Sequence, residues 1–106
     1  MREQPKALIY TRTATDPASS IAGQEAACRE FAVSNGLAVK AVYSDSCVSG
    51  NTLGPEIQKL LSYISTDQTD CHLIVTEANR LGRSLEIHAS VMKQLSAANV
   101  TVHYAD

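Results

Sequence analysis

The sequence predicts an α/β fold, a three-layer α/β/α domain whose mostly parallel sheet is flanked by helices. Short apolar runs alternate with stretches of helical periodicity in the order β-α-β-α-β-α-β. The run Leu73-Ile74-Val75-Thr76 is continuous and β-branched, which is typical of a strand buried on both faces. Helical connections of this length imply parallel strands, and 106 residues fit one compact domain.

The first half of the chain predicts two strands joined by a helix. Ala7–Tyr10 is a short apolar run and predicts the first strand. Ser20 is a plausible N-cap, and Gly36 is placed to end the helix. Leu37–Tyr43 predicts the second strand, and Ser44–Gly54, rich in Ser, Asp, Asn and Gly, predicts a loop. The apolar positions at helical spacing are Ile21, Cys28, Phe31 and Ala32.

The second half predicts two more helices and two more strands. Pro55 suits the first turn of a helix, because its missing N–H is not needed there. Leu73–Thr76 is the third strand, Ser84 is a possible cap, and Val100–Tyr104 alternates like a last strand. The predicted helix faces are Ile57, Leu60, Leu61 and Ile64 for one helix, and Leu85, His88, Met92 and Leu95 for the other.

Composition excludes several classes of protein. Hydrophobic residues make up 44%, enough for a core, and the net charge of −2 lacks the basic excess of a free-standing DNA-binding domain. Three cysteines without a Cys-x-x-Cys pair suggest neither a disulfide framework nor a zinc site. The three histidines are not at ligand spacing, so no metal or other cofactor is predicted. Without a long apolar stretch or a signal peptide, the expectation is a soluble, cytoplasmic protein without membrane contact.

Candidate functional residues follow three of the predicted strands. Arg12 and Ala14 come after the first strand, Asp45 after the second, and Asn79 to Arg83 after the third. Ligands of parallel α/β sheets bind at the carboxyl ends of the strands, so these residues should converge. Guanidinium groups match phosphate oxygens bidentately, and Arg80 and Arg83 would share one helical face. The pattern predicts a phosphate site, against the alternative of solvated surface arginines.

Other phosphate chemistries do not fit this sequence. A receiver domain needs an acidic pair after the first strand, where this chain has Arg12 and Thr13. A cysteine phosphatase loop needs an arginine where Leu53 follows Cys47. No Gly-x-x-x-x-Gly-Lys occurs, and no cluster of acids suits a magnesium-dependent nuclease.

The ordered set of motifs resembles the catalytic domain of serine recombinases, the resolvase and invertase family, over nearly the whole chain. The opening Tyr-x-Arg-x-Ser of that family is matched at Tyr10 and Arg12 and broken at Ala14, which occupies the position of the nucleophilic serine. The remaining matches are Gln24, Asp45, Ser49, Gly50, Arg80, Leu81 and Arg83.

Two further positions depart from the pattern of the family. Gly54 stands where an arginine usually precedes Pro55, and Asn79 stands in place of an aspartate. An engineered serine-to-alanine change would explain Ala14 alone, so a degenerate, non-cleaving member is the more economical interpretation. Thr13 and Thr15 are possible substitute hydroxyls, but strand alternation would turn them away from the site.

The resemblance implies a definite chemistry and definite partners. In the family a serine attacks a DNA phosphodiester without a metal, arginines hold the phosphate, and a tetramer exchanges and religates the strands. The expected partners are therefore the DNA phosphate backbone and another recombinase subunit or a second copy of the chain. Residues 1–106 are expected to be the catalytic domain, lacking the long helix and DNA-binding domain that normally follow. The alternative is a non-catalytic interaction or regulatory module with the same fold.

Overall fold

The computed structural model describes residues 5–13, 18–45, 54–66, 71–76 and 85–105. These residues form alternating strands and helices, as the hydrophobic pattern predicts. The elements are β1 (Lys6–Arg12), α1 (Ala18–Ser34), β2 (Ala38–Asp45), α2 (Pro55–Thr66), β3 (Cys71–Val75), α3 (Leu85–Ala97) and β4 (Val100–Tyr104). Among the described residues, no helix is long and apolar enough to cross a membrane.

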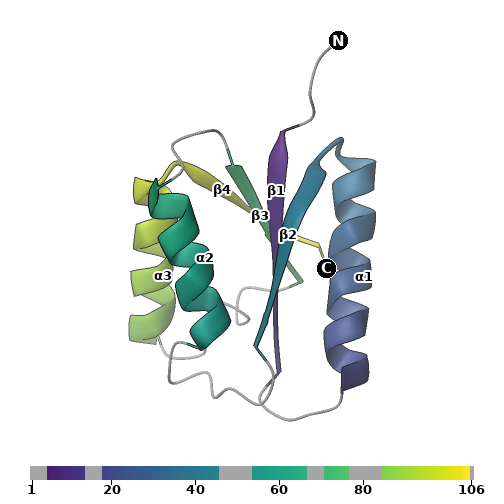
Figure 1. The fold of residues 1–106 in the computed structure, drawn as a ribbon, viewed down its shortest axis with the longest axis horizontal. Helices are drawn as coiled ribbons and strands as arrows, with labels where there is room; N and C mark the ends of the chain where they lie inside the picture. The colour runs from purple at the N-terminus through teal and green to yellow at the C-terminus, as the bar shows by residue number, and fades with distance from the viewer. Residues whose placement is uncertain (1–4, 14–17, 46–53, 67–70, 77–84, 106) are drawn as a thin grey trace.

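The four strands form one parallel sheet in the order β2-β1-β3-β4. Helix α1 covers one face, and α2 and α3 cover the other, which gives the three predicted layers (Figure 1). All strands run in the same direction, so their carboxyl ends lie at one edge, the lower edge in Figure 1, where α1 and α2 begin. The fold thus brings the ends of β1 and β2 together at that edge.

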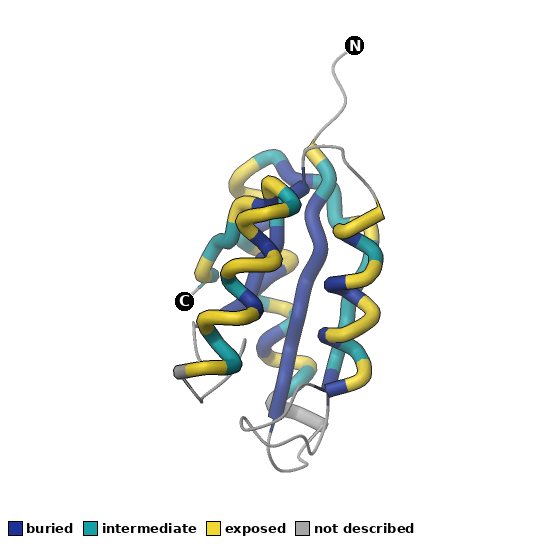
Figure 2. The backbone as a smooth tube through the Cα atoms, turned by 90° about the vertical axis from the view of Figure 1, so that its left-hand side faces the viewer, coloured by how far each residue is buried: buried dark blue, intermediate teal, exposed yellow. Residues whose placement is uncertain are grey.

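The core consists of two apolar layers separated by the sheet. The larger layer lies under α2 and α3 and includes Leu8, Leu60 and Leu73, while the smaller layer lies under α1 and includes Ile9, Cys28 and Ile74. Figure 2 shows the buried strand positions between helices whose outer faces are exposed. β1 and β3 are buried on both sides, which explains their continuous apolar sequences.

Two residues in the left-handed region end helices where the chain must turn back to the sheet. Gly36 has φ 68° and follows α1. The N–H of Leu37 bonds to Ala32 O at 2.9 Å, and the N–H of Gly36 bonds to Val33 O at 3.3 Å, which together make a Schellman cap. Asn99, with φ 60°, plays the corresponding part after α3. The predicted stop at Gly36 is confirmed.

A register shift in β2 sets the pairing at the carboxyl edge. Ala7 pairs with Val39 and Leu8 with Ala41, so Lys40 is an extra residue in β2. Beyond this bulge the register brings Tyr10 opposite Tyr43, and Arg12 opposite Asp45. The last residues of the two strands are thus side by side.

The ends of two strands differ from the sequence prediction. β1 extends to Arg12, and β2 includes Ser44 and Asp45, which were predicted to start a loop. Polar residues continue these strands because Thr11 Oγ1 donates to Ser44 Oγ at 2.7 Å and the N–H of Thr13 bonds to Asp45 O at 3.0 Å. The ladder, rather than hydrophobicity, therefore decides where the strands end.

The buried face of α3 also differs from its prediction. Val91 and Leu95 are its buried residues, whereas His88 is only half-buried. Val91 lies four residues before Leu95 and shares its face, so the predicted stripe omitted its central residue. By contrast, all four residues predicted for the face of α2 are buried.

Candidate phosphate-binding site at the carboxyl edge of the sheet

Asp45 is the centre of a buried polar cluster at the ends of β1 and β2. The hydroxyl of Tyr10 donates to Asp45 Oδ2 at 2.7 Å. Tyr10 and Asp45 are 1% and 2% exposed, so this hydrogen bond is shielded from water. A bond to a carboxylate in such a place is stronger than one between neutral groups. The two residues therefore fix each other across the strand pair.

The Asp45 carboxylate also caps helix α2. Its Oδ1 accepts from the N–H of Glu56 at 3.0 Å, and its Oδ2 accepts from the N–H of Ile57 at 3.1 Å. These are two of the N–H groups that a helix cannot satisfy internally, and a negative group favours the positive end of the helix dipole. Asp45 thus replaces the side chain that Gly54, the residue before the helix, does not have.

Gly54 is required by the position of this carboxylate. A Cβ atom on Gly54 would overlap the carboxyl carbon and oxygens of Asp45. Asp45 has little room to move, because three hydrogen bonds hold it. Any side chain at position 54, including the arginine of the family pattern, would displace Asp45 from the start of α2.

Gln24 anchors the end of β1 to α1. β1 pairs with β3 only from Lys6 to Ile9, so the backbone of Arg12 lies beyond the last β3 partner. Gln24 Oε1 accepts from the Arg12 N–H at 3.1 Å, and Gln24 Nε2 donates to the Arg12 carbonyl at 3.0 Å. The side-chain amide thereby supplies both bonds that a neighbouring strand would have made.

Arg12 is a buried cation beside this cluster, only 4% exposed. Burial raises the pKa of the Tyr10 hydroxyl, the hydrogen bond to Asp45 raises it further, and the charge of Arg12 opposes the rise. Tyr10 is therefore a neutral hydrogen-bond donor at physiological pH. The guanidinium is close enough to influence the phenol electrostatically, and it adds positive charge where the strands end.

The hydroxyl of Thr13 is buried and has no hydrogen-bond partner in the described part of the chain. Along β1, Leu8 and Tyr10 belong to the core layer under α2, whereas Ala7 and Ile9 belong to the layer under α1. Alternation therefore assigns Thr13 to the α1 side, opposite Arg12. This supports the view that Thr13 does not replace a nucleophile beside Arg12.

Four of the sequence-predicted site residues lie within the described residues and meet at one edge. These are Tyr10, Arg12, Gln24 and Asp45. The other four lie outside the described residues: Ala14, Ser49, Arg80 and Arg83. Asn79 and Thr15 also lie outside them. The predicted convergence of the three arginines therefore stays a prediction.

Sequence reasoning missed one polar pair on the other side of the sheet. His72 Nδ1 and His103 Nε2 lie 2.8 Å apart, on neighbouring strands β3 and β4. The two residues are 31 positions apart in sequence. Only the strand order and register bring them together, so no local spacing could have indicated the pair.

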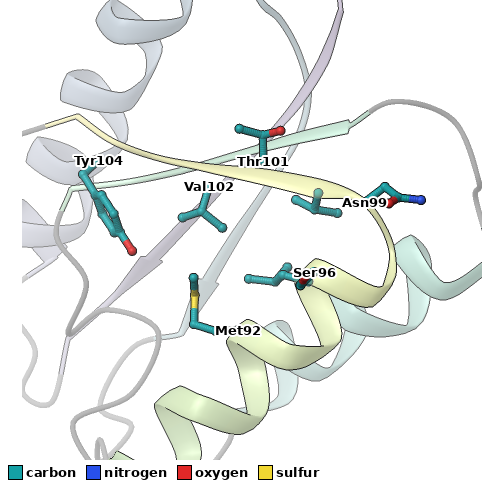
Figure 3. Close-up of a pocket in the computed structure, with 8 residues that line it drawn as sticks. Met92, Ser96, Asn99, Thr101, Val102 and Tyr104 are labelled. Atoms are coloured by element: carbon teal, nitrogen blue, oxygen red, sulfur yellow. The ribbon is translucent and has the colours of Figure 1, made fainter.

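A groove between α3 and β4 is unrelated to the candidate site. Met92 points from the helix toward Val102, and the ring of Tyr104 reaches from the strand toward the helix, while Thr101 points to the other side of the strand (Figure 3). No charged side chain belongs to the groove lining that the structure describes. It therefore lacks the cations that a phosphate would need.

The sequence profile described as "Resolvase, N terminal domain" matches residues 7–106. The chain belongs to the resolvase family of serine recombinases. No curated protein matches this resolvase-type domain. Its parallel sheet and flanking helices are the resolvase-like fold of serine recombinase catalytic domains.

Solved structures with the same fold include two catalytic domains and a resolvase family recombinase. The N-terminal catalytic domain of TP901-1 integrase is 26% identical with a TM-score of 0.84, and the match covers 94% of this chain and 77% of the other. The C-terminal catalytic domain of ISC1926 TnpA, an IS607-like serine recombinase, is 23% identical with a TM-score of 0.84, covering 95% and 70%. A resolvase family site-specific recombinase from Streptococcus pneumoniae is 19% identical with a TM-score of 0.79, covering 96% and 72%.

Proposed function

We propose that this domain is a non-cleaving serine recombinase catalytic domain that binds a DNA backbone phosphate. The observation that carries the proposal is the contrast between Arg12 and Ala14. Arg12 stands at the carboxyl edge, anchored by Gln24 and opposite Asp45, while the residue two positions later has no atom that can attack phosphorus. Binding groups are present and the attacking group is absent.

The phosphate would be held by guanidinium groups at the ends of the strands. Arg12 supplies one, and Arg80 and Arg83 are proposed as the others. Electrostatic attraction to the backbone is independent of DNA sequence and falls with salt concentration. A domain with a net charge of −2 would bind weakly, so its affinity for DNA would depend on this local cluster.

An adduct assay tests the missing nucleophile. The protein is incubated with supercoiled DNA, denatured, and analysed for protein-linked strands. We expect no adduct from the unchanged chain, and a robust adduct would contradict the proposal. Ala14→Ser is the matched variant, and it should remain inefficient because Gly54 also lacks the cation of the family pattern. Full activity from this single change would show that the other departures are harmless.

A binding assay tests the phosphate site separately. Fluorescence anisotropy with a labelled duplex at low salt compares the unchanged chain with Arg12→Gln and Arg12→Lys. Arg12→Gln should weaken binding and reduce the salt slope by about 1, whereas Arg12→Lys keeps the charge and most of the slope. Circular dichroism confirms folding of each variant. Equal binding by folded Arg12→Gln and the unchanged chain would remove Arg12 from the site.

A second candidate function is a non-catalytic module that pairs with an active recombinase subunit or with a second copy. The fit between Gly54 and Asp45 favours it, because the loss of the arginine at position 54 is accommodated by a well-bonded helix cap. The test is sedimentation of the chain alone and mixed with a cleavage-competent recombinase. Mixed oligomers with reduced cleavage would support this function, and purely monomeric behaviour in both samples would exclude it.

A further inference from the structure

His72 and His103 form a close pair of imidazoles on the α1 face of the sheet. In the register of β3 and β4, His72 lies opposite Thr101 and His103 lies opposite Ile74, so the histidines are diagonal neighbours on the same face. Their rings are stacked with centroids 5.1 Å apart, and His72 Nδ1 lies 2.8 Å from His103 Nε2. Phe31 of α1 packs against His103 with centroids 5.4 Å apart.

We propose that His72 and His103 form a two-nitrogen binding site for a divalent transition-metal ion with square or tetragonal coordination, such as Ni²⁺ or Cu²⁺. Metal–imidazole bonds are about 2.0–2.1 Å long. Two such bonds at a right angle place the nitrogens about 2.9 Å apart, and at a tetrahedral angle about 3.3 Å apart. The hydrogen-bonded separation of 2.8 Å is closer to the right-angle value, so a square or tetragonal ion requires the smaller movement of the two rings.

A metal ion can replace the hydrogen bond between the two imidazoles without a change in the number of bound protons. In the metal-free pair one facing nitrogen carries a proton and the other accepts it. With His103 as the donor, its Nε2 proton is exchanged for one on Nδ1 when the ion binds, as a neutral imidazole can do. Both rings must also turn away from the N–N line so that their two lone pairs meet at the metal, and two neutral rings then bind the ion without net proton release.

The surroundings favour an accessible site with exchangeable positions. Both histidines are half-buried, so the pair is not enclosed in the core. No group of three or more His, Cys, Asp or Glu side chains that could hold a metal occurs in the described part of the chain. The two imidazoles are therefore the protein ligands that the described residues supply, with water in the remaining positions. This site is separate from the carboxyl edge, so it does not depend on the proposed recombinase function.

Isothermal titration of the unchanged chain with Ni²⁺ tests the proposal, in a buffer that does not bind metals. Ni²⁺ is the probe because it does not oxidise thiols. We expect one site, lost or weakened about tenfold or more in His72→Asn and in His103→Asn. His88→Asn on α3 is the matched control and should bind like the unchanged chain. Equal affinity in all four proteins, or tighter binding of Zn²⁺ than Ni²⁺, would overturn the proposal.

A second measurement does not require the variants to fold. Cu²⁺ is paramagnetic and broadens the NMR signals of nearby residues in the unchanged chain. The amide signals of Ile74, Thr101 and their neighbours should disappear first, while those around His88 persist. Broadening centred on His88 or on the segment containing Cys47 would place the metal elsewhere and overturn the proposal.

Discussion

The two faces of the sheet are covered differently, and the polar groups on each face follow from that difference. Two helices close the α2/α3 face, and its buried polar groups Tyr10 and Asp45 satisfy each other and the start of α2. One helix covers the α1 face, where His72 and His103 remain half-buried beside Phe31. Buried polar groups are usually hydrogen-bonded, and the α2/α3 cluster follows this rule, whereas the α1 face also holds the buried Thr13 hydroxyl, which has no partner among the described residues.

The residues on the α2/α3 face that match the recombinase motif also have a structural role. Tyr10 and Asp45 fit the pattern of the family, but both make hydrogen bonds that hold the fold together. Their presence is therefore explained by stability alone. Arg12 is buried at the same edge, opposite Asp45, and its role in binding phosphate stays a prediction.

The largest expected effect comes from Asp45→Ala. The change leaves the N–H groups of Glu56 and Ile57 and the hydroxyl of Tyr10 without their acceptor, so the free energy of unfolding should fall by about 3 kcal/mol. Urea unfolding measures it. Asp45→Asn retains one carbonyl oxygen and should lose less. Glu25→Ala, which removes only a surface ion pair with Arg29, is the control and should cost at most about 0.5 kcal/mol. An Asp45→Ala variant as stable as this control would show that the α2/α3 face does not need its polar cluster.

Gly54→Ala should have the next largest effect. Its Cβ would overlap the Asp45 carboxylate, and the expected cost is about 2 kcal/mol in the free energy of unfolding. Combined with Asp45→Ala, the same change should cost almost nothing, because the overlap is gone. Gly23→Ala is the control: it lies in α1 with nothing within 4 Å of the new atom and should add about 0.5–1 kcal/mol of stability. If Gly54→Ala cost the same free energy of unfolding in the unchanged chain and in Asp45→Ala, the close packing of Gly54 against Asp45 would be refuted.

Features of the fold were predictable from the sequence where their physical cause lies within a few residues along the chain. Pro55 and Gly36 predicted helix ends correctly, because capping and φ preferences act within a few residues. The four-residue face of α2 was also correct, since helical periodicity is a local signal. Ser44 and Asp45 were wrongly assigned to a loop, because their strand bonds come from β1.

The candidate site was predictable in place but not in detail. Strand-end position and the family pattern indicated Tyr10, Arg12, Gln24 and Asp45. The role of Asp45 as the cap of α2 requires knowing that Gly54 packs against it, which is a tertiary contact. The His72–His103 pair depends on the register of two parallel strands, which no spacing in the sequence encodes.

Tyr10→Phe should have a smaller effect and sharpen the account of the cluster. The ring stays in the core, and only the donor to Asp45 Oδ2 is lost. The two backbone N–H groups of α2 still satisfy the carboxylate, so the expected loss is about 1 kcal/mol in urea unfolding. A loss as large as that of Asp45→Ala would mean that the phenol, rather than the helix cap, is the main partner of Asp45.

The last prediction needs no mutation and concerns the reactivity of Cys28 on the α1 face. Burial and the nearby charge of Glu25 raise the pKa of the Cys28 thiol to about 11, and its Sγ lies 3.7 Å from Ile74 O. At pH 8 its thiolate fraction is about two hundredfold lower than that of an exposed cysteine with a pKa near 8.5. Labelling with iodoacetamide, followed by peptide mass spectrometry, should therefore be at least that much slower in the folded chain than in guanidinium.

The raised pKa also sets the direction of an alkaline effect. The thiol form is favoured in the folded state, so this contribution to stability is present below the unfolded pKa of about 8.5 and is lost as the pH rises toward about 11. Cys28→Ala should flatten that decline. Rapid labelling of Cys28 in the folded chain would mean that α1 separates readily from the sheet. The α1 face would then be mobile. Because Phe31 and Cys28 belong to the same helix, such opening would also expose the histidine pair.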